Sequence, residues 1–467
     1  MSRCGRGSRQ SRCTATLNPS VRGVSLVTVV AVDDTDSRTE GMCTTYLAAR
    51  LAERLDGVER SVLVRLSPAV DHKTRGNAAV AVHTTAPPDR ARAAAVDLVE
   101  AFALVGDASP GVVVFGGDPT AVPAAVAQFA RDAVRRPCAP GRALRLLADI
   151  ECEAVGWGGG ERVRGGERVP GGAEAKESDL IGRGRVGALA AVGAWRAFDE
   201  WTYERIDYRE FERCGTPREV DERSVFAAAA DAYPAAWDTV DRVAGEPVCV
   251  PNAPGPILCG VRGDDPDTVE QVADRIDAEP VARSAVFHTN QGTDAHLQPG
   301  EIGRLRADRA YRVTAVVCES PETRAGGHVF FEVADEREAD NDTTLDCVAF
   351  EPTKRFRDRV RKLRVGDRVT ICGEYDGTLK LEKFALRELN RTRRVVPTCE
   401  CERSMESAGR GQGYRCRDCG ARAPGKETVR VDRDLEQGWY EVPPRARRHV
   451  ARPLVRGGFD APTHPER

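Results

Sequence analysis

The first 150 residues alternate between strand-like and helix-like hydrophobic patterns. Runs rich in β-branched residues predict strands at 25–32, 60–66, 77–83 and 111–115. Leucines that recur at every fourth position from Leu47 to Leu55 predict a helix, and further helices are predicted at 89–105 and near 119–135. Because strands that alternate with helices are typical of α/β domains, we expect residues 24–150 to form one.

The pattern changes at a glycine-rich segment and then resumes. Eight glycines fall within residues 156–172, which predicts a flexible loop or hinge at a domain boundary. Residues 178–209 return to helical character, and residues 216–298 alternate strand-like pieces with an acidic helix at 264–277. We therefore expect residues 151–298 to form an α+β domain of the ferredoxin-like kind.

The C-terminal third is predicted to consist mainly of short strands. After Pro299 and Gly300, five short strands separated by turns fill residues 310–388, with a helix-like segment at 354–363 between the third and the fourth. This order predicts an OB-fold barrel over residues 300–392. The whole chain is thus expected to be multidomain, α/β plus α+β, with an α/β domain, a ferredoxin-like domain and an OB-fold barrel.

The two ends of the chain are expected to be poorly ordered. Residues 1–23 hold five arginines and no acidic residue, which predicts a disordered extension. A cysteine cluster occupies residues 396–422, and the Pro-, Arg- and Gly-rich residues 423–467 are expected to form a loose C-terminal tail.

Composition narrows the class of protein. The 467 residues include 41% hydrophobic and 30% charged side chains, as in soluble multidomain proteins. The longest apolar runs, such as 26–32 and 111–115, are far shorter than the roughly 18 residues that a membrane span needs, so no membrane association is expected. The 15 cysteines are mostly scattered singly, which does not fit a disulfide framework and indicates a reducing cytoplasm. No obligate protein partner is indicated.

Charge is divided between the two parts of the chain. The net charge is −3, yet residues 23–299 carry 30 basic and 43 acidic side chains, whereas residues 300–467 carry 34 and 29. An acidic first part and a mildly basic second part are compatible with chemistry in the one and nucleic-acid binding in the other.

The most concentrated candidate chemistry follows the first predicted strand. Asp33, Asp34 and Asp36 place three carboxylates within four residues, and their mutual repulsion favours a bound cation such as Mg²⁺. The next helix begins near Thr44 and Thr45, where free backbone N–H groups and hydroxyls suit a phosphate. A helix cap with an Asx-turn is the alternative, and it accounts for one or two of these aspartates but not for three.

These segments resemble a known family. The stretch VDDTDSRTEGMCTTYL and, at 64–81, VRLSPAVDHKTRGNAAVA are similar to segments of the archaeal isoleucine-tRNA 2-agmatinylcytidine synthetase (agmatidine synthetase) family. Later segments of the family are matched in the same order by GRGRVGALAAVGA at 182–194, WTYERIDYR at 201–209, PREVDERSV at 217–225 and TNQGTDAHL at 289–297. The resemblance covers about residues 24–422. It implies an ATP-dependent kinase-like domain at 24–150, followed by a ferredoxin-like domain, an OB-fold and a zinc ribbon at 396–422.

The resemblance implies a specific reaction. Members of the family use ATP to join agmatine to position 2 of the wobble cytidine of the minor isoleucine tRNA with a CAU anticodon, so that the anticodon reads AUA. Asp33, Asp34 and Asp36 match the acidic metal and ATP motif, and Thr44 matches the threonine that family members autophosphorylate. Because the position-2 oxygen is a poor leaving group, a phosphoryl group from ATP must first be attached to it.

Further ligands are assigned on the same basis. We expect phosphate or ATP contacts from a set of polar side chains in the first domain: Thr35, Thr45, Lys73, Arg75 and Asn77. A solvated loop is the alternative for Lys73 and Arg75. The dication agmatine needs carboxylates, for which the middle domain offers Asp199, Glu200, Glu204 and Asp294. The glycine-rich run at 182–187 lacks the ending of a Walker A motif and is weak support for phosphate binding.

The cysteine cluster predicts a structural zinc site. Cys399, Cys401, Cys416 and Cys419 have ribbon-like spacing, although the first pair is one residue closer than usual, and paired free thiols are the alternative. Nearby basic and aromatic side chains suit RNA contact: Lys354, Arg355, Arg410, Tyr414 and Arg415. For the basic run near 354–364, a solvated helix face is the bland alternative.

Two hypotheses of different classes remain at this point. The first is an ATP-dependent tRNA-modifying ligase that uses agmatine, Mg²⁺ and a structural Zn²⁺. The second is a non-catalytic protein whose barrel and ribbon bind single-stranded nucleic acid. ATP consumption that depends on both agmatine and tRNA distinguishes them.

Overall fold

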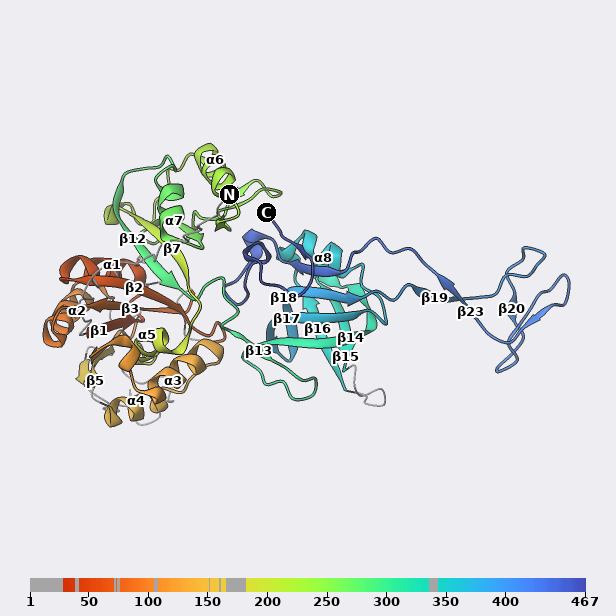
Figure 1. Ribbon diagram of the computed structural model, residues 1–467, viewed down its shortest axis with the longest axis horizontal. Coiled ribbons are helices and arrows are strands. Elements are labelled where there is room, and N and C mark those ends of the chain that lie inside the picture. The colour runs from red at the N-terminus through yellow and green to blue at the C-terminus, as the bar shows by residue number, and fades with distance from the viewer. Residues whose placement is uncertain are drawn as a thin grey trace, which may run out of the picture.

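A computed structural model describes residues 28–37, 42–70, 73, 76–104, 108–150, 152–158, 161–164, 182–335 and 343–467. The molecule is elongated, with a large α/β body at one end, a barrel in the middle and a small β-unit at the far end (Figure 1). The expected N-terminal extension and Arg75 lie outside the described residues.

The first half of the body is a six-stranded antiparallel sheet in the order β6-β5-β4-β1-β3-β2. Its strands are β1 (Thr28–Asp33), β2 (Val58–Arg65), β3 (Ala78–Thr84), β4 (Gly111–Gly116), β5 (Cys152–Gly158) and β6 (Glu161–Arg164). Its helices are α1 (Thr44–Arg54), α2 (Pro88–Phe102), η1 (Pro119–Ala121), α3 (Ala124–Arg135), α4 (Pro140–Asp149) and α5 (Arg185–Ala197). The strands predicted within residues 25–115 are confirmed as β1 to β4, and α4 is a helix that the pattern did not predict.

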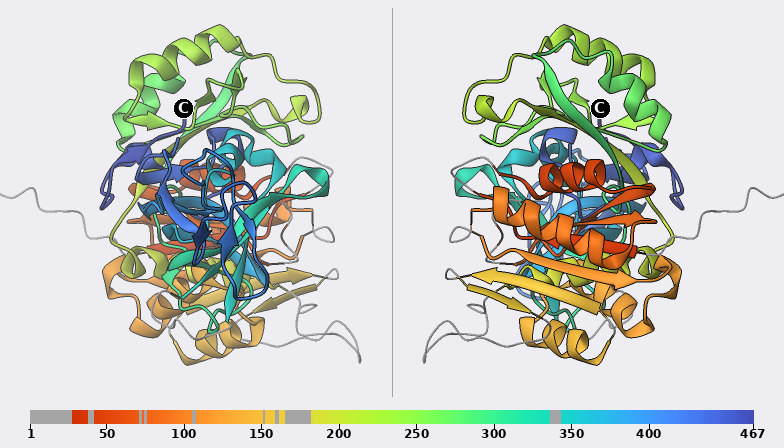
Figure 2. Two further views of the ribbon diagram at one scale, coloured as in Figure 1. Left: turned by 90° about the vertical axis from the view of Figure 1, so that its right-hand side faces the viewer. Right: turned by 90° about the vertical axis from the view of Figure 1, so that its left-hand side faces the viewer.

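Helices cover both faces of this sheet. Val30 and Val32 of β1 pack with α1 and α2, whereas Val29 and Ala31 pack with α3 and α5, since alternate side chains of a strand point to opposite faces. Figure 2 shows α1 and α2 together on one side of the strands. Because both faces are buried, the four central residues of the strand, 29–32, are all apolar instead of alternating with polar ones.

The expected loop at 156–172 is wrong for its first part. Residues 156–158 belong to β5 and residues 161–164 form β6, so the sheet continues past the predicted boundary at 150/151. Gly156 has no room for a side chain, because a Cβ there would lie 2.8 Å from the Cα of Gly182. The glycines permit close packing here. Helix α5, expected in the second domain, packs on the first half of the sheet.

The second half of the body extends the same sheet. Strand β12 (Val281–Thr289) pairs in parallel with β2, from Phe287 opposite Ser61 to Thr289 opposite Leu63, and the order continues β12-β7-β11-β8. The added strands are β7 (Thr202–Arg209), β8 (Ala236–Trp237) and β11 (Ile257–Gly263), with η3 (Phe211–Arg213), α6 (Glu222–Ala232) and α7 (Pro266–Ala273) beside them and a small β9–β10 pair (Val240–Asp241, Glu246–Pro247). The result is one continuous ten-stranded sheet.

The barrel closes through five strands in the pairing order β14-β15-β16-β18-β17-β14. They are β14 (Arg309–Thr323), β15 (Val329–Ala334), β16 (Thr344–Ala349), β17 (Arg368–Asp376) and β18 (Thr378–Glu388). The predicted helix between the third and fourth of these strands is α8 (Arg355–Val360), and two short turns, η4 (Ala325–Gly327) and η5 (Glu351–Thr353), precede it. β13 (Leu297–Pro299) pairs with β14 on the outside.

A narrow two-stranded neck leads from the barrel to the far end of the molecule (Figure 1). It pairs β19 (Thr392–Val395) with β23 (Glu427–Arg430). Beyond it lies a three-stranded sheet of β20 (Glu406–Ser407), β21 (Tyr414–Arg415) and β22 (Arg422–Ala423), which carries the cysteine cluster.

The expected poorly ordered tail at 423–467 is wrong. After β23 the chain returns to the barrel, where β24 (Gly438–Glu441) pairs with β18 and then with β25 (Thr463–His464), and η6 (Pro444–Ala446) and η7 (Leu454–Arg456) lie between them. Trp439 is fully buried, and the ring of Tyr440 stacks on His464. Composition misled here because a few spaced apolar residues anchor a segment that is otherwise rich in Pro, Arg and Gly.

Candidate active site

Thr44 is held at the start of α1 by two neighbours from the acidic loop. Its hydroxyl donates to the Oδ1 atom of Asp36 at 2.5 Å, and its backbone N–H donates to the same oxygen at 2.8 Å. The hydroxyl of Thr35 donates to the Thr44 Oγ1 at 3.0 Å. A hydroxyl that donates to a carboxylate and is fixed by a second donor has the arrangement of an activated nucleophile.

Asp33 and Asp34 differ from Asp36 in their surroundings. Burial raises the pKa of Asp33 well above its usual range, and the charge of Asp34 adds to this effect. Asp34 has a positive φ of 53°, and its Oδ2 accepts from Arg183 Nε at 3.0 Å. A carboxylate pair of this kind, crowded and only partly neutralised by one arginine, fits a divalent cation with hard oxygen ligands.

Helix α5 begins directly against these carboxylates. A Cβ on Gly187 would lie 1.8 Å from the Oδ2 of Asp33, so only glycine fits there. Arg183 comes from the same GRGRVG segment, and the sequence analysis did not assign it a role. In the sequence, Arg183 is visible only as an arginine in a glycine-rich segment just before a helix. Such arginines are too common to show which one contacts Asp34.

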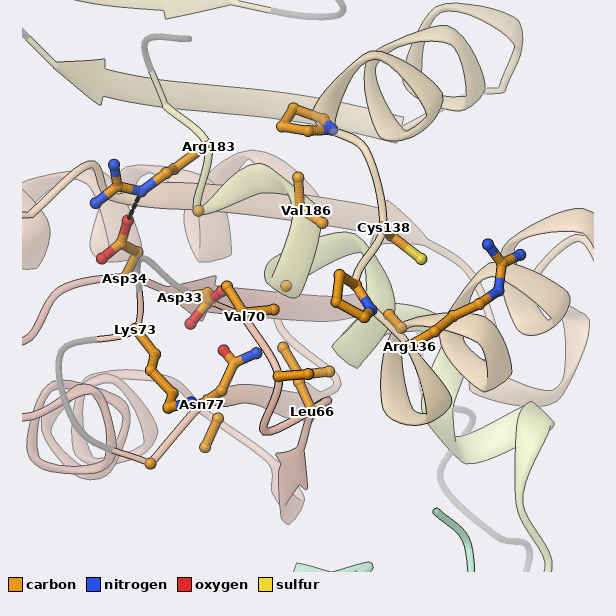
Figure 3. Close-up of a pocket in the computed structure, with 18 of the residues that line it drawn as sticks. Asp33, Asp34, Leu66, Val70, Lys73, Asn77, Arg136, Cys138, Arg183 and Val186 are labelled. Carbon is orange, nitrogen blue, oxygen red and sulfur yellow. Dashed lines mark hydrogen bonds and ion pairs between the residues drawn. The ribbon is translucent and has the colours of Figure 1, made fainter. Parts of the chain in front are cut away.

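The three aspartates and Thr44 line a cavity of about 420 Å³, called the acidic cavity below. Lys73 and Asn77 line it too, with the Lys73 ammonium donating to the Pro68 carbonyl and the Asn77 amide donating to the Ser67 carbonyl at 2.9 Å. Figure 3 shows Asp33, Asp34, Lys73 and Asn77 toward one side of the cavity, and Arg136, Cys138 and Val186 toward the other.

The second side of the acidic cavity is mainly apolar and was missed by the sequence analysis. Beside Arg136, this side is lined by Pro137, Cys138, Pro140 and Val186, and Leu66 and Val70 add apolar contacts near Asn77 (Figure 3). A cavity with carboxylates at one end and apolar walls at the other suits a nucleotide, whose phosphates need a cation and whose base needs apolar contact. The connection between α3 and α4 showed no motif that could have identified it.

A second cavity, of about 210 Å³, lies on the other side of Thr44 and is called the small cavity below. It shares Asp36 and Thr44 with the acidic cavity and is also lined by Cys43, Thr45 and Glu204. Thr45 is buried, and its Oγ1 lies 3.2 Å from the Cys43 Sγ. Thr45 therefore faces the small cavity and not the acidic one.

Glu204 is buried between two arginines at the edge of the small cavity. It accepts from Arg65 Nη2 at 2.9 Å and from Arg262 Nε at 3.2 Å. Burial acts to raise the pKa of Glu204, but Arg262 and Arg65 outweigh it and hold the pKa below its usual value. The carboxylate is therefore charged at neutral pH.

The other three acidic candidates of the middle domain lie elsewhere. Glu200 pairs with Arg452 and Arg456, and Asp294 pairs with Lys383 at 2.8 Å and accepts from the Arg452 N–H. Asp199 is exposed. The structure therefore brings only Glu204 of the four to a cavity that contains Thr44.

A third cavity, of about 550 Å³, opens between the body and the barrel and is called the interdomain cavity. Its lining is rich in charged groups from both parts and from the returning C-terminal segment, among them Arg65, Arg262, Asp308, Glu374, Lys380 and Arg448. Gly76 lines all three cavities, and Asn77 and Lys73 line the acidic and interdomain cavities. The three cavities therefore adjoin one another at Gly76, and two of them also share Thr44.

The TNQGTD segment at 289–294 holds Arg65, which lines both the small and the interdomain cavity. Asn290 accepts from the Arg65 N–H at 2.7 Å and donates to the Arg65 carbonyl at 3.0 Å. These bonds fix the end of β2, from which Arg65 reaches Glu204.

The predicted RNA-contacting residues fall into two groups. Tyr414, partly buried, and Arg415, exposed, lie on β21 of the far three-stranded sheet, and the exposed Arg410 lies in the turn that precedes β21. Lys354 forms an exposed pair with Glu351, whereas Arg355 pairs with Glu466 and Asp241 and connects α8 to the C-terminus and the body. Arg355 is therefore an interdomain contact.

The four cysteines of the ribbon converge. Their Sγ atoms all lie within 4.8 Å of one another, with separations of 3.1 Å for Cys399–Cys419, 3.5 Å for Cys401–Cys416 and 3.8 Å for Cys401–Cys419. A tetrahedral Zn²⁺ with Zn–S bonds of about 2.3 Å requires sulfur separations of about 3.8 Å. Convergence of all four at one point fits a metal site better than two separate thiol pairs, despite the short first spacing.

Comparison with known proteins identifies the family. Three family models match: the TiaS TCKD domain at residues 29–158, the TiaS FLD domain at 182–296 and the TiaS C-terminal zinc ribbon domain at 396–435. The tRNA 2-agmatinylcytidine synthetase TiaS of Haloquadratum walsbyi is 50% identical, over 94% of this chain and 100% of that protein. The chain belongs to the TiaS family. The Methanosarcina mazei TiaS is 41% identical over 92% and 97% of the two chains.

Solved TiaS structures have the same fold. A complex of TiaS with an isoleucine tRNA and ATP matches with a TM-score of 0.79 at 37% identity, covering 95% of this chain and all of that one. A complex of TiaS with the same tRNA, AMPCPP and agmatine matches with a TM-score of 0.77 at 35% identity and the same coverage. The resemblance inferred from the sequence motifs is confirmed. Among the described residues, no helix is both long and apolar enough to cross a membrane.

Proposed function

We propose that this protein uses ATP to attach agmatine to position 2 of the wobble cytidine of the minor isoleucine tRNA, which carries a CAU anticodon. The observation that carries the proposal is the position of Thr44. Its hydroxyl is bonded to Asp36 and lies in the wall between the acidic cavity and the small cavity. Membership of the TiaS family supports the same activity.

The acidic cavity suits ATP. Its apolar side offers contacts for the base, and Lys73, Asn77 and Arg183 offer donors for phosphate oxygens. Asp33 and Asp34 are the residues that would hold Mg²⁺, which supplies charge neutralisation at the transferred phosphoryl group. Asp36 holds the Thr44 hydroxyl and orients it toward that group. The phosphate role expected for Thr45 remains a prediction, and its position favours the small cavity.

The small cavity suits agmatine. Asp36 and Glu204 supply carboxylates to a space whose other wall is largely apolar, as a four-carbon diamine-like chain requires. Glu204 is shared with two arginines, so it orients the guanidinium end instead of neutralising it alone. Asp199, Glu200 and Asp294 are not part of this proposed site.

The interdomain cavity suits the tRNA nucleotide. It opens between the catalytic body and the barrel, and it meets the other two cavities at Gly76. A phosphoryl group passes first from ATP to the Thr44 hydroxyl, whose proton Asp36 accepts while ADP leaves, and then from Thr44 to the position-2 oxygen of cytidine. The primary amine of agmatine then bonds to that carbon, the phosphate leaves with the oxygen, and the amine loses a proton. Proximity of the three cavities lets these steps occur without release of the intermediate.

The barrel and the ribbon suit RNA binding. We propose that the barrel is an OB-fold, because its strand pairing order 1-2-3-5-4-1 with a helix after the third strand is typical of that fold. The second half of the body is proposed to be ferredoxin-like, since β7 lies between β11 and β12 and α6 and α7 connect them. Zn²⁺ is proposed at the four cysteines, with Arg410, Tyr414 and Arg415 available to RNA.

The test is direct. The pure protein is incubated with ATP, agmatine and an unmodified tRNA transcript, and the anticodon nucleoside is measured by mass spectrometry. We expect a cytidine that has gained agmatine and lost one oxygen, formed only when all three substrates are present. If RNA binds in a salt-sensitive way but no substrate is converted, the non-catalytic alternative would hold instead.

A further inference from the structure

We infer that Arg218 is a positioning residue that sets the length of amine accepted by the small cavity. This inference rests on the proposed function, because it takes the small cavity to be the agmatine site. Arg218 belongs to the PREVDERSV segment and lines the small cavity. The proposed reaction gives it no other role.

The guanidinium of Arg218 is bonded to three carbonyls of one loop. Nε donates to the Ile257 carbonyl at 2.7 Å, and Nη2 donates to the Ala253 carbonyl at 2.7 Å and to the Gly255 carbonyl at 3.1 Å. The planar, fixed arrangement of guanidinium donors suits several carbonyls at once, which a lysine ammonium cannot reproduce in the same plane.

The loop needs such a donor because of its own sequence. Pro251, Pro254 and Pro256 lack backbone N–H groups, so this segment cannot form a regular ladder with a neighbour. The carbonyls between the prolines are satisfied by Arg218 instead. The backbone adds two further bonds, from Gly215 N to the Pro254 carbonyl and from Arg209 N to the Pro256 carbonyl, each 2.9 Å.

A buried ion pair holds Arg218 itself in place. Arg209 and Glu279 are fully buried and bonded through two contacts, at 2.7 and 2.8 Å. Arg209 also donates to the carbonyls of Thr216 at 2.8 Å and Pro217 at 3.0 Å, immediately before Arg218. Arg209, on strand β7, thus fixes the backbone from which Arg218 extends.

The residues that Arg218 holds form one wall of the small cavity. Ala253, Gly255 and Ile257 line it, on a different element from Thr44 and Asp36. Nothing in the described lining of this wall is charged except Arg218, whose donors point into the loop. The distance from Glu204 to this wall thus depends on how far Arg218 draws the loop back, and that distance selects the chain length of the amine.

The experiment compares R218A, R218K and the exposed control R223A in the complete enzyme with tRNA and ATP. The substrates are agmatine and its homologue with one more methylene, and a second assay follows label transfer from ATP to the protein without amine. For R218A we expect the KM for agmatine to rise about tenfold and the preference for agmatine over the homologue to fall at least fivefold, because one methylene in a fitted pocket is worth tenfold or more.

The remaining readouts separate positioning from general damage. With saturating agmatine, kcat of R218A is expected within about threefold of the unmodified enzyme, and its label transfer is unchanged. The KM and the preference of R218K lie between those of R218A and the unmodified enzyme. R223A matches the unmodified enzyme in every readout. An unchanged KM and preference in both variants would overturn the inference, as would an equal fall of kcat and label transfer. If R218A does not fold, R218K decides alone. An unmodified enzyme that forms no product would refute the proposed function, not this role.

Discussion

The hydroxyl of Thr44 and the carboxylate of Asp36 are joined by a hydrogen bond of 2.5 Å, although the two residues are eight positions apart in the chain. The contact joins a hydroxyl and a carboxylate that both line the acidic cavity and the small cavity. The same carboxylate oxygen accepts the Thr44 N–H, so the start of α1 and the acidic loop are fixed to each other.

Removal of the Thr44 hydroxyl is expected to stop phosphoryl transfer. T44A should lower kcat by at least a hundredfold while ATP still binds, whereas T44S should retain most activity because it keeps the oxygen. Label transfer from ATP and agmatidine formation measure the two steps. If T44A retained full turnover, the hydroxyl would have only a structural role.

Neutralisation of Asp36 tests the base. D36N keeps the shape but loses the acceptor charge, so we expect a hundredfold or greater fall in kcat with little change in stability. D97N, on the exposed face of α2, is the matched control and should leave kcat unchanged. Equal activity of the two variants would contradict the role of Asp36.

Removal of a ribbon cysteine should release zinc without stopping the chemistry in the body. For C401S we expect less than one equivalent of zinc by elemental analysis and a weaker affinity for full-length tRNA, because the ribbon loses its fold. C318S, on β14 and outside the cluster, is the control. Full zinc content in C401S would show that the metal is held elsewhere.

The returning C-terminal segment is expected to stabilise the barrel. Trp439 is fully buried and its Nε1 donates to Asp460 at 2.9 Å, so W439A should lower the free energy of unfolding by about 3–5 kcal/mol. V243A, at a residue that is 71% exposed, should change it by less than about 0.5 kcal/mol. Urea unfolding compares them, and a small effect of W439A would mean that the segment is dispensable.

Two buried histidines predict a loss of stability in mild acid. The rings of His296 and His449 lie 5.0 Å apart between the body and the C-terminal segment, near Arg65, Arg135, Arg448 and Glu374. Burial lowers the pKa of His296 to about 4 and that of His449 well below its usual value. Both are neutral in the folded protein, but they gain a proton in the unfolded chain below about pH 6.5.

Stability is therefore present above about pH 6.5 and falls as the pH drops toward about 4, by about 1.4 kcal/mol per pH unit for each histidine. Urea midpoints at about pH 7.5, 6 and 5 measure this, and the double variant H296F/H449F should show a shallower decline. Parallel declines of the two proteins would assign the pH dependence to other groups.

The hydrophobic pattern along the chain predicted those strands and helices whose residues are apolar at regular local spacing. Continuous β-branched runs identified β1 to β4, and the five strands and helix of the barrel followed from turn spacing. Strand β5 was missed because Gly156, of a residue type that normally interrupts elements, here allows close approach to Gly182 and Arg185, and β6 follows it within the same glycine-rich stretch. The C-terminal strands depend on burial of Trp439 against β18, a long-range contact that composition does not reveal.

The site divides in the same way. Asp33, Asp34, Asp36 and Thr44 lie close in sequence and could be found as a motif. Arg183, Cys138 and Arg218 reach the cavities from distant segments, and only the packing of α5, the α3–α4 connection and the proline-rich loop brings them there. Charge alone could not separate Glu204 from Glu200, since both pair with two arginines.

The parallel pairing of β12 with β2 links two segments that are far apart in the chain. A one-residue insertion within β12 would turn its alternate side chains to the opposite face and carry Asn290 away from Arg65, and with it the guanidinium that meets Glu204. Replacements that keep the alternation of side chains leave this register in place, whereas a change in the length of β12 would disturb the contacts that fix Arg65 on the neighbouring strand.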